Sequence, residues 1–237
     1  MKIVLLRVGI DTGCGGHHSP LFEDRTFEFV PIPDSLDMDE RTYGNTVGRK
    51  RRALVEYFPE NRRERMKGQP MHVDPEFQTF TYGDPTPPKR GLSRLEYGDL
   101  LVFYAGMQGW NHQSAPALYL AGYFRVELVG YAPSFSKEIL SREFGGNYHV
   151  RHPKVFAEQR ERLLLIKGGK GSRLFEKAHL VGKTYARKNR PAWQMITPEM
   201  AKVFGRFGGI GSLQRSTPRW VEEQLTVGAE SFVESLD

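Results

Sequence analysis

The chain has 237 residues, of which 39% are apolar and 26% are charged, and its net charge is +6. This composition is typical of one large or two small globular domains, and it excludes a disordered chain, a fibre and a coiled coil. No stretch approaches the roughly 20 apolar residues that a membrane span needs, and the single cysteine, Cys14, excludes an intrachain disulfide. Arg7 interrupts the apolar run at the N-terminus, which therefore predicts a strand rather than a signal peptide, and we expect a cytoplasmic location.

The first ninety residues predict strands at the start and irregular chain after them. Residues 2–9 predict a buried strand, and residues 11–20 predict a loop because three glycines and a proline lie there. Residues 26–32 predict a second strand, which follows a hairpin turn. In the polar stretch that comes next we predict a helix at about 48–57, and the five prolines between 70 and 92 predict irregular surface chain.

The remaining chain alternates between strand and helix patterns. The clearest strand signal lies at 99–105, and one or two further strands are predicted in 117–131. Helices are predicted at 136–144, 155–162, 197–207 and 217–225, the last because Thr217 and Pro218 suit the N-cap and first helical positions.

Basic residues gather in two stretches of the chain. Residues 41–70 hold nine Lys or Arg against three acidic residues, and residues 151–190 hold twelve against three. Clustered cations displace counterions from phosphate backbones, so the pattern favours a polyanionic partner, although a solvated arginine-rich surface gives the same pattern.

One set of N-terminal features resembles a known family. It comprises the first strand, the glycine loop, an acidic hairpin turn and the motifs Asp11, Gly15-Gly16, Ser19-Pro20 and Pro31-Ile32-Pro33-Asp34. This pattern is similar to the third type of nucleotide-modification-associated domain, with weaker likeness at 147–149 and 168–175. The resemblance covers about 35 residues well. It implies a role in base-modification systems that act on nucleic acid.

Residues 97–124 carry a second resemblance. A Gly-Asp turn enters a strand, and a later strand holds the run Leu120-Ala121-Gly122-Tyr123. This arrangement is similar to PUA-like domains, including the EVE type, which implies a small β-barrel with an aromatic pocket for a base. A generic hairpin gives a similar pattern. We therefore predict an α+β fold with a mixed, β-rich, barrel-like (PUA-like) core and peripheral helices, as a single compact domain over 1–237 with a basic, proline-rich insertion at about 35–92.

The glycine loop at 11–19 holds the first candidates for catalysis. Asp11 could act as a general base or a metal ligand, and His17 as its acid/base partner. Together with His18 and Cys14 these residues resemble a metal-ligand set, but adjacent histidines tend to point apart and no C-x2-C spacing exists. No metal site is therefore predicted, no cofactor is indicated, and Cys14 is more simply an inert thiol than a nucleophile.

Two further candidates for catalysis lie outside that loop. His149 belongs to a polar loop, where it could serve as an alternative acid/base partner. Asp34 begins an acidic run that could hold a cation, although a solvated loop is the simpler interpretation. The candidate catalytic residues are thus Asp11, His17, Asp34 and His149.

Several polar, basic and aromatic side chains are candidates for nucleic-acid contacts. Trp110 could stack on a base, and Asn111 and Asn147 could bond to base edges. The GGKGS run at 168–172 is not a Walker motif, but it could contact a backbone phosphate; lids over the core, capped loops and flexible turns are the structural alternatives. The candidate contacts are Arg49, Arg51, Arg52, Trp110, Asn111, Asn147, Arg151, Lys170, Ser172 and Arg173.

These features predict a protein of nucleic-acid base modification, acting on DNA rather than RNA, as an enzyme or an enzyme component. The alternative is a non-catalytic reader of modified or flipped bases with a PUA/EVE-like pocket, and a small-molecule enzyme is a third possibility. Other proteins of a modification system are possible partners, and no membrane partner is expected. The hypothesis requires the glycine loop and the two basic stretches to lie on one side of the fold.

Overall fold

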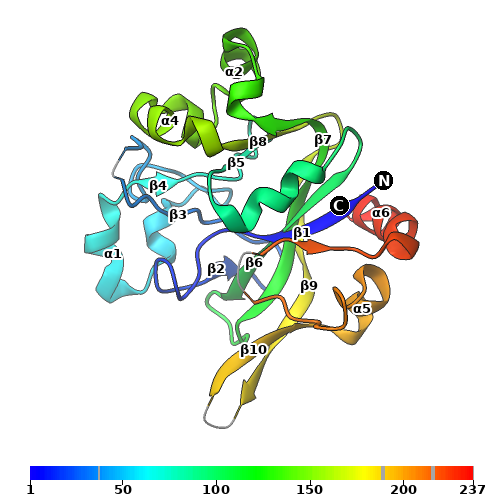
Figure 1. Cartoon of the computed structure of the whole chain (residues 1–237). Coiled ribbons are helices and arrows are strands. Elements are labelled where there is room, and N and C mark those ends of the chain that lie inside the picture. The colour runs from blue at the N-terminus through cyan, green and yellow to red at the C-terminus, as the bar shows by residue number, and fades with distance from the viewer. Residues whose placement is uncertain (37, 188–189, 215–216, 237) are drawn as a thin grey trace.

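A large mixed sheet forms the framework of the computed structural model, which describes residues 1–36, 38–187, 190–214 and 217–236 (Figure 1). Its central path runs in the order β10-β9-β7-β6-β1-β11, while β2 pairs with β6, and β8 pairs with both β5 and β7. A separate ribbon joins β3 to β4. The strands are β1 (Ile3–Arg7), β2 (Ser19–Leu21), β3 (Ile32–Pro33), β4 (Met71–His72), β5 (Thr81–Asp84), β6 (Leu100–Gly109), β7 (Ala117–Tyr131), β8 (Leu164–Gly168), β9 (Arg173–Arg187), β10 (Arg190–Ile196) and β11 (Arg219–Trp220).

The central strands are buried on both faces of the sheet. Successive side chains of a strand point to opposite faces, and in β1 Leu5 joins one apolar cluster while Val4 and Leu6 join another. Strand β6 behaves in the same way, with Val102 on the first side and Phe103 on the second. This explains why the sequence of both strands is a continuous apolar run rather than an alternating one.

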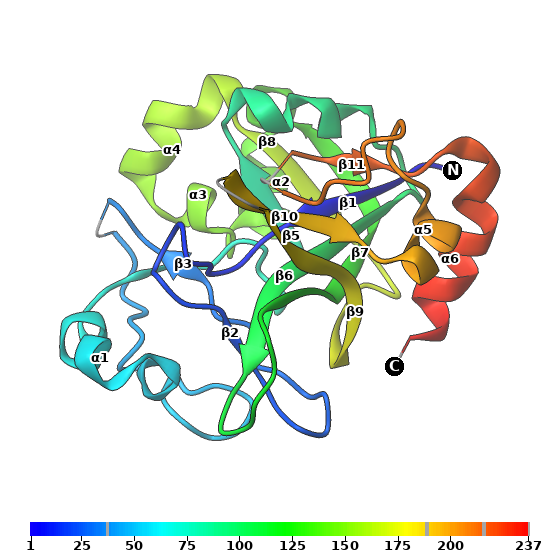
Figure 2. The same ribbon diagram turned by 90° about the horizontal axis from the view of Figure 1, so that it is seen from below.

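Helices cover both faces and one edge of this sheet (Figures 1 and 2). Residues of α5 and α6 pack against the first cluster, and Leu92 of η2 packs into the second. The helices α2, α3 and α4 lie beside β5 and β8, whereas α1 belongs to the region around β3 and β4 (Figure 1). The helices are η1 (Leu54–Tyr57), α1 (Glu60–Lys67), η2 (Pro87–Arg94), η3 (Ala132–Ser134), α2 (Lys137–Phe144), α3 (Tyr148–Arg151), α4 (Pro153–Gln159), η4 (Arg160–Arg162), α5 (Pro198–Phe204), η5 (Glu223–Leu225) and α6 (Thr226–Ser235).

Strands β1 and β2 lie end to end along a single neighbour, β6. Strand β1 pairs in parallel with residues 100–104 of β6, and β2 pairs in parallel with residues 107–109. The chain between them, residues 8–18, leaves the sheet and returns to the same strand. This excursion is the predicted glycine loop, and backbone hydrogen bonds from Val8 to Tyr104 and from Ile10 to Val30 hold its first residues.

The predicted α+β class is confirmed, and so are the helices at 136–144 and near 197–207. The helix predicted at 48–57 is wrong, because only a short 3-10 turn forms there and α1 follows Pro59. The helix predicted at 217–225 is also wrong: Arg219 and Trp220 pair with β1, since an apolar edge of the sheet is available there. Residues 71–92 contain β4, β5 and η2 rather than irregular chain alone. The strand pairings of the described residues follow an open path, so the barrel-like, PUA-like core stays a prediction.

No helix in the described part of the chain is long and apolar enough to cross a bilayer.

Candidate active-site cleft

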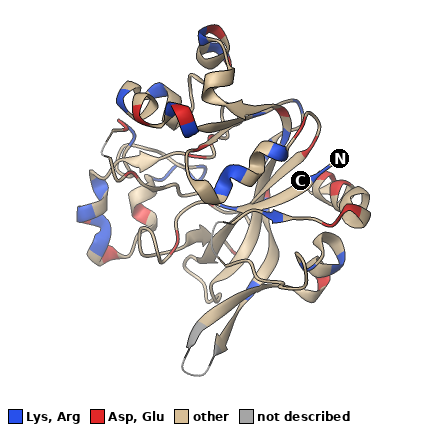
Figure 3. Ribbon diagram, in the orientation of Figure 1, with Lys and Arg blue, Asp and Glu red and all other residues tan. Residues whose placement is uncertain are grey.

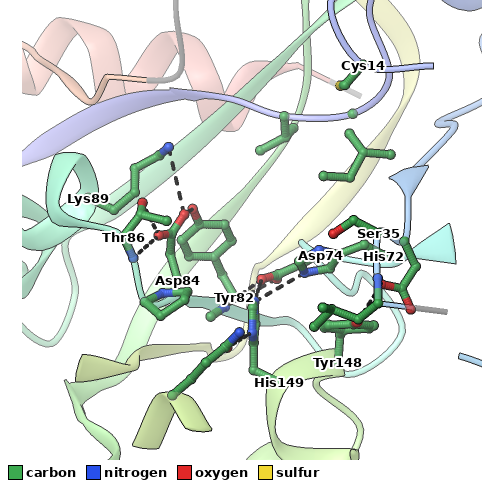
Figure 4. A pocket seen from close by; sticks show the side chains of 18 of the residues that line it. Cys14, Ser35, His72, Asp74, Tyr82, Asp84, Thr86, Lys89, Tyr148 and His149 are labelled. Atoms are coloured by element: carbon green, nitrogen blue, oxygen red, sulfur yellow. Dashed lines mark hydrogen bonds and ion pairs between the residues drawn. The ribbon is translucent and has the colours of Figure 1, made fainter. Parts of the chain in front are cut away.

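A cleft of about 670 Å³ lies where the glycine loop, the β3–β4 ribbon, β5, η2 and α3 meet (Figure 4). This volume is within the range of small-molecule sites, roughly 300–1,000 Å³. Its walls carry ionisable side chains from segments that are far apart in the sequence: Arg7, Asp11, Cys14, Asp34, His72, Asp74, Tyr82, Asp84, Lys89, Tyr148 and His149.

Three of these side chains form a buried cluster, which we call the His-Asp-His cluster: His72, Asp74 and His149. The Nε2 atoms of the two histidines are 3.2 Å apart, and His149 Nε2 lies 3.4 Å from Asp74 Oδ2. One ligand atom from each residue lies within 4.8 Å of the others. Figure 4 shows the carboxylate and both imidazoles directed toward one another.

Burial controls the protonation of this cluster. Burial raises the pKa of Asp74 to about 6 and lowers the pKa of His72 to about 3. Burial also acts to lower the pKa of His149, but the neighbouring Asp74 carboxylate outweighs it and raises the pKa above the usual value. Carboxyl and imidazole groups that titrate close to neutral pH are suited to proton transfer.

The backbone around His149 is arranged to bring its imidazole close to β5. Asn147 is fully buried, caps α3 by accepting a hydrogen bond from the His149 amide, and donates weakly to Asp74 (3.5 Å). Gly83 lies against this pair, and a Cβ there would be 2.8 Å from Asn147 Oδ1 and 2.9 Å from His149 Cδ2. On the other side of the ring, His149 Nδ1 is 2.6 Å from Gln159 Oε1.

The carboxylate of Asp34 organises the loop after β3. Its oxygens accept hydrogen bonds from the amides of Leu36, Met38 and Asp39 and from the hydroxyl of Tyr148. Burial disfavours the charged form, but these four donors outweigh it and hold the pKa of Asp34 below its usual value. Asp34 therefore fixes the shape of the cleft wall. Tyr148 in turn stacks on His72, with ring centroids 4.0 Å apart.

The glycine loop contributes Asp11 and Cys14 to the cleft. Asp11 accepts hydrogen bonds from the amides of Gly13 and Cys14 and forms a 3.1 Å ion pair with Arg7. Burial raises the pKa of the Cys14 thiol, which is the opposite of what an activated nucleophile needs. This direction favours an inert thiol, which stays a prediction from the sequence.

A buried cation lies near the other end of β5. Lys89 Nζ is 3.8 Å from Asp84, and the side chain of Lys89 is 7% exposed. Burial lowers the pKa of Lys89, while Asp84 acts in the opposite direction. Asp84 also accepts hydrogen bonds from Thr86 and from the hydroxyl of Tyr82. The cleft therefore holds a paired ammonium group as well as the His-Asp-His cluster.

The cleft brings together three of the four predicted catalytic residues, Asp11, Asp34 and His149. His17 is elsewhere: it lines a second hollow of about 300 Å³ and packs on Phe58, with ring centroids 4.0 Å apart and the rings tilted by 45°. Both of its ring nitrogens are buried and have no hydrogen-bond partner within the described part of the chain, and burial lowers its pKa to about 4.

Of the predicted nucleic-acid contacts in the first basic stretch, Arg52 lies against Trp110. The guanidinium of Arg52 sits over the Trp110 ring at 5.3 Å, and Trp110 packs on Phe22 and Tyr57. Arg51 and Asn111 are exposed, each with a positive φ. Arg49 donates a hydrogen bond to the carbonyl of Phe175.

The remaining predicted contacts lie in other places. Arg151 pairs with Glu40 and Asp39, and Lys170 is exposed in the turn between β8 and β9. Ser172 accepts a hydrogen bond from the amide of Arg125. Arg173 donates to the carbonyls of Glu234 and Leu236, at the C-terminal end of the chain. With Asn147 capping α3, these candidates form no single cluster around the cleft.

Both basic stretches nevertheless reach the neighbourhood of the glycine loop and the cleft. Arg62, from the first stretch, donates a hydrogen bond to the carbonyl of Gly15. Gln159, which lies within the second stretch, lines the cleft beside His149.

Sequence reasoning missed His72, Asp74, Lys89 and Tyr148. The first two form a His-x-Asp spacing, which places both side chains on one side of an extended chain. That signal was available, but the prolines around it favoured an interpretation as irregular surface chain. Lys89 and Tyr148 carry no local signal, because their importance arises only when β5, η2 and α3 meet.

Comparisons with known proteins identify the family. Searches of curated proteins and of solved structures gave no match. The family model of nucleotide modification associated domain 3 matches residues 2–231, nearly the whole chain. This match includes the glycine loop, the Pro-Ile-Pro-Asp segment and the cleft. The chain therefore belongs to the nucleotide modification associated domain 3 family.

Proposed function

We propose that this protein is an enzyme that modifies a base in DNA and that the cleft receives the target nucleotide after it leaves the base stack. Membership of the nucleotide modification associated domain 3 family supports a role in nucleic-acid modification. The observation that carries the enzymatic part is the His-Asp-His cluster, because three titratable groups converge at the wall of a cleft of about 670 Å³. Perturbed titratable groups in a cleft are typical of active sites.

The walls of the cleft suit a nucleotide. Enzymes that act on bases extrude the target and bind it between aromatic or apolar groups and polar side chains that contact its edge. Here His72 forms an aromatic wall with the buried ring of Tyr148 stacked behind it, while Arg7 and Lys89 supply cations to the same cleft. In this proposal the cations attract the phosphate, and the His-Asp-His cluster lies at the wall where it can act on the base.

The distribution of basic residues supports a polyanionic substrate. Lys and Arg lie on α1, η2 and α4 (Figure 3), and η2 and α4 contribute Lys89 and Gln159 to the wall of the cleft. A nucleic-acid backbone that crosses these elements would be held by phosphate contacts, and the extruded base would supply the specificity.

The test is a comparison of nucleosides from cells that express the wild-type chain, His149→Ala or Lys202→Ala. Lys202 is an exposed residue of α5 and serves as the matched control. DNA and RNA are digested separately and analysed by mass spectrometry, so that the cells supply any co-substrate. We expect a new nucleoside in the DNA with the wild type and Lys202→Ala, and its loss with His149→Ala.

Two other outcomes would contradict parts of the proposal. A new nucleoside in RNA alone would overturn the preference for DNA. Unchanged nucleosides in both pools, together with tight binding of an already modified oligonucleotide, would favour the non-catalytic reader. In the structure, Leu120 and Tyr123 of the segment that resembles PUA-like domains are buried in the core, so such a reader would have to bind the base elsewhere, in the cleft or in the second hollow beside Trp110.

A further inference from the structure

We propose that the His-Asp-His cluster is a metal centre for a divalent first-row transition metal, bound by Nε2 of His72, Nε2 of His149 and a carboxylate oxygen of Asp74. Two imidazoles and one carboxylate are a recurring ligand set for Fe²⁺ and related ions that leaves other coordination positions open. The role of the metal at the substrate rests on the proposed function, whereas metal binding itself does not.

The distances within the cluster fit a shared cation. Metal–ligand distances for imidazole nitrogen are about 2.0–2.1 Å. A cation about 2.1 Å from both Nε2 atoms, which are 3.2 Å apart, would make an N–metal–N angle of about 100°. The 3.4 Å between His149 Nε2 and Asp74 Oδ2 gives a similar angle, about 110°. Both angles are compatible with tetrahedral or facial octahedral coordination. The third pair, His72 and Asp74, lies within 4.8 Å; two bonds of about 2.1 Å span at most about 4.2 Å, so the bound cation requires this pair to be no farther apart than that.

One hydrogen bond fixes the tautomer of His149 in the cluster. His149 Nδ1 lies 2.6 Å from Gln159 Oε1, and because an amide oxygen accepts, Nδ1 carries the proton of this bond. In the neutral ring, Nε2 then carries a lone pair, and this atom faces His72 Nε2 and Asp74 Oδ2. The 3.4 Å from this nitrogen to the carboxylate is long for a charge-assisted hydrogen bond, which is about 2.7–2.9 Å. A divalent cation would use the lone pairs of all three residues together.

The surroundings of the cluster match those of known metal centres. A metal-binding histidine usually donates its other ring N–H to an oxygen acceptor, which fixes the tautomer and the orientation of the ring. Gln159 occupies this position for His149. Asp74 is anchored in turn, because the amide of Gly83 donates to its carboxylate at 2.9 Å. Asp74 and His149 are therefore held in place by hydrogen bonds with Gly83 of β5 and Gln159 of α4.

The open side of the proposed centre faces the cleft. All three ligands line the same cavity as Arg7, Lys89 and Tyr148. Coordination positions not filled by the protein would be open to water or to an oxygen or nitrogen atom of the bound nucleotide. Imidazole ligands favour Fe²⁺, Mn²⁺, Co²⁺ or Zn²⁺ over Mg²⁺ and Ca²⁺, which prefer oxygen.

The experiment titrates a tag-free chain, stripped with a chelator, with Co²⁺, Mn²⁺, Zn²⁺ and Mg²⁺, and with Fe²⁺ under anaerobic conditions. Bound metal is counted by elemental analysis after gel filtration, and the visible absorption of Co²⁺ reports its coordination. We expect one transition-metal ion per chain and no comparable binding of Mg²⁺. His72→Ala and Asp74→Ala should each weaken Co²⁺ binding at least a hundredfold, while His112→Gln, a histidine outside the cleft, should bind like the wild type.

A second variant covers the possibility that loss of a buried ligand prevents folding. Gln159→Leu touches no ligand atom and removes only the hydrogen bond to His149 Nδ1, so it should weaken metal binding by about 10–100-fold. Circular dichroism of the metal-free proteins verifies that each variant is folded. Failure of the wild type to bind any transition metal, or equal affinity in wild type, His72→Ala and Gln159→Leu, would overturn the inference.

The two proposals fail in different ways. One bound ion per chain without any new nucleoside supports the metal centre and contradicts the proposed enzymatic function. A new nucleoside made by a chain that binds no metal overturns the metal centre and leaves the enzymatic function intact.

Discussion

The hydroxyl of Tyr148 donates a 2.7 Å hydrogen bond to Oδ1 of Asp34, joining α3 to the loop after β3. The two residues are separated by 114 positions in the sequence. Tyr148 also stacks on His72, so one aromatic ring connects the wall of the cleft to the His-Asp-His cluster. The acidic loop after β3 is therefore part of the support of the site.

This bond predicts a measurable loss of stability in Tyr148→Phe. A hydrogen bond to a charged acceptor contributes about 1.5–3 kcal/mol, and we expect the free energy of unfolding to fall by that amount. Asp34→Ala should cost more, because it also removes the acceptor for three backbone amides. Urea denaturation measures both, with Tyr97→Phe as the control because Tyr97 is 84% exposed. A Tyr148→Phe variant as stable as the control would contradict the prediction.

The close packing at Gly83 predicts a different kind of defect. In Gly83→Ala the new methyl group would lie within 3 Å of both Asn147 and His149, so α3 must shift. We expect a loss of about 1–3 kcal/mol, as for other overpacked sites, and weaker Co²⁺ binding. Gly68→Ala is the matched control, because a Cβ there meets nothing within 4 Å. Wild-type affinity and stability in Gly83→Ala would show that the cluster does not depend on this contact.

The burial of the His17 imidazole predicts that the free energy of unfolding depends on pH. Burial lowers its pKa from 6.5 to about 4, so between these values the unfolded chain binds the proton and the folded chain does not. Stability is then unaffected above pH 6.5 and falls as the pH drops toward 4, by at most about 3 kcal/mol. His17→Phe keeps a ring beside Phe58 and removes the titration. As the pH falls from 7 to 4.5, the stability of His17→Phe, measured by urea denaturation, should therefore rise relative to that of the wild type. A difference in stability that does not change with pH would refute the assignment.

The pair of Arg52 and Trp110 offers a test of nucleic-acid contact away from the cleft. Each phosphate contact contributes about 0.9 to the slope of log affinity against log salt concentration. If Arg52 binds a phosphate, Arg52→Ala should reduce the magnitude of that slope on duplex DNA by about 0.9, the contribution of one contact. Fluorescence anisotropy at several salt concentrations measures the slope, with Lys202→Ala as the control. Equal slopes in Arg52→Ala and the wild type would remove Arg52 from the binding surface.

The sequence predicts some of these features and not others, for physical reasons. The strands β1 and β6 were predictable because burial on both faces demands a continuous apolar run. The N-caps Ser136 and Thr197 marked the helices that follow them, since each accepts a hydrogen bond from an amide in the first turn. Thr217 and Pro218 gave a similar signal without a helix, because pairing of the next residues with β1 overrode the local preference.

The candidate site was predictable only in part. Asp11, Asp34 and His149 belong to local motifs that are visible in the sequence, and all three line the cleft. The His-Asp-His cluster was not predictable, because it needs β4 and α3 to meet across Gly83, and this contact depends on the whole fold. The case of His17 shows the opposite limit: its loop reaches the cleft through Asp11 and Cys14, but its own side chain packs on Phe58, away from the cleft.

The end-to-end arrangement of β1 and β2 along β6 has a consequence for insertions and deletions in the segment between them. The strands on both sides of the excursion at residues 8–18 pair with the same strand, β6. The length of the excursion can therefore change without altering the register of the sheet. A change in the length of this segment would therefore move Asp11 and Cys14 along the wall of the cleft without moving the strands that form the core.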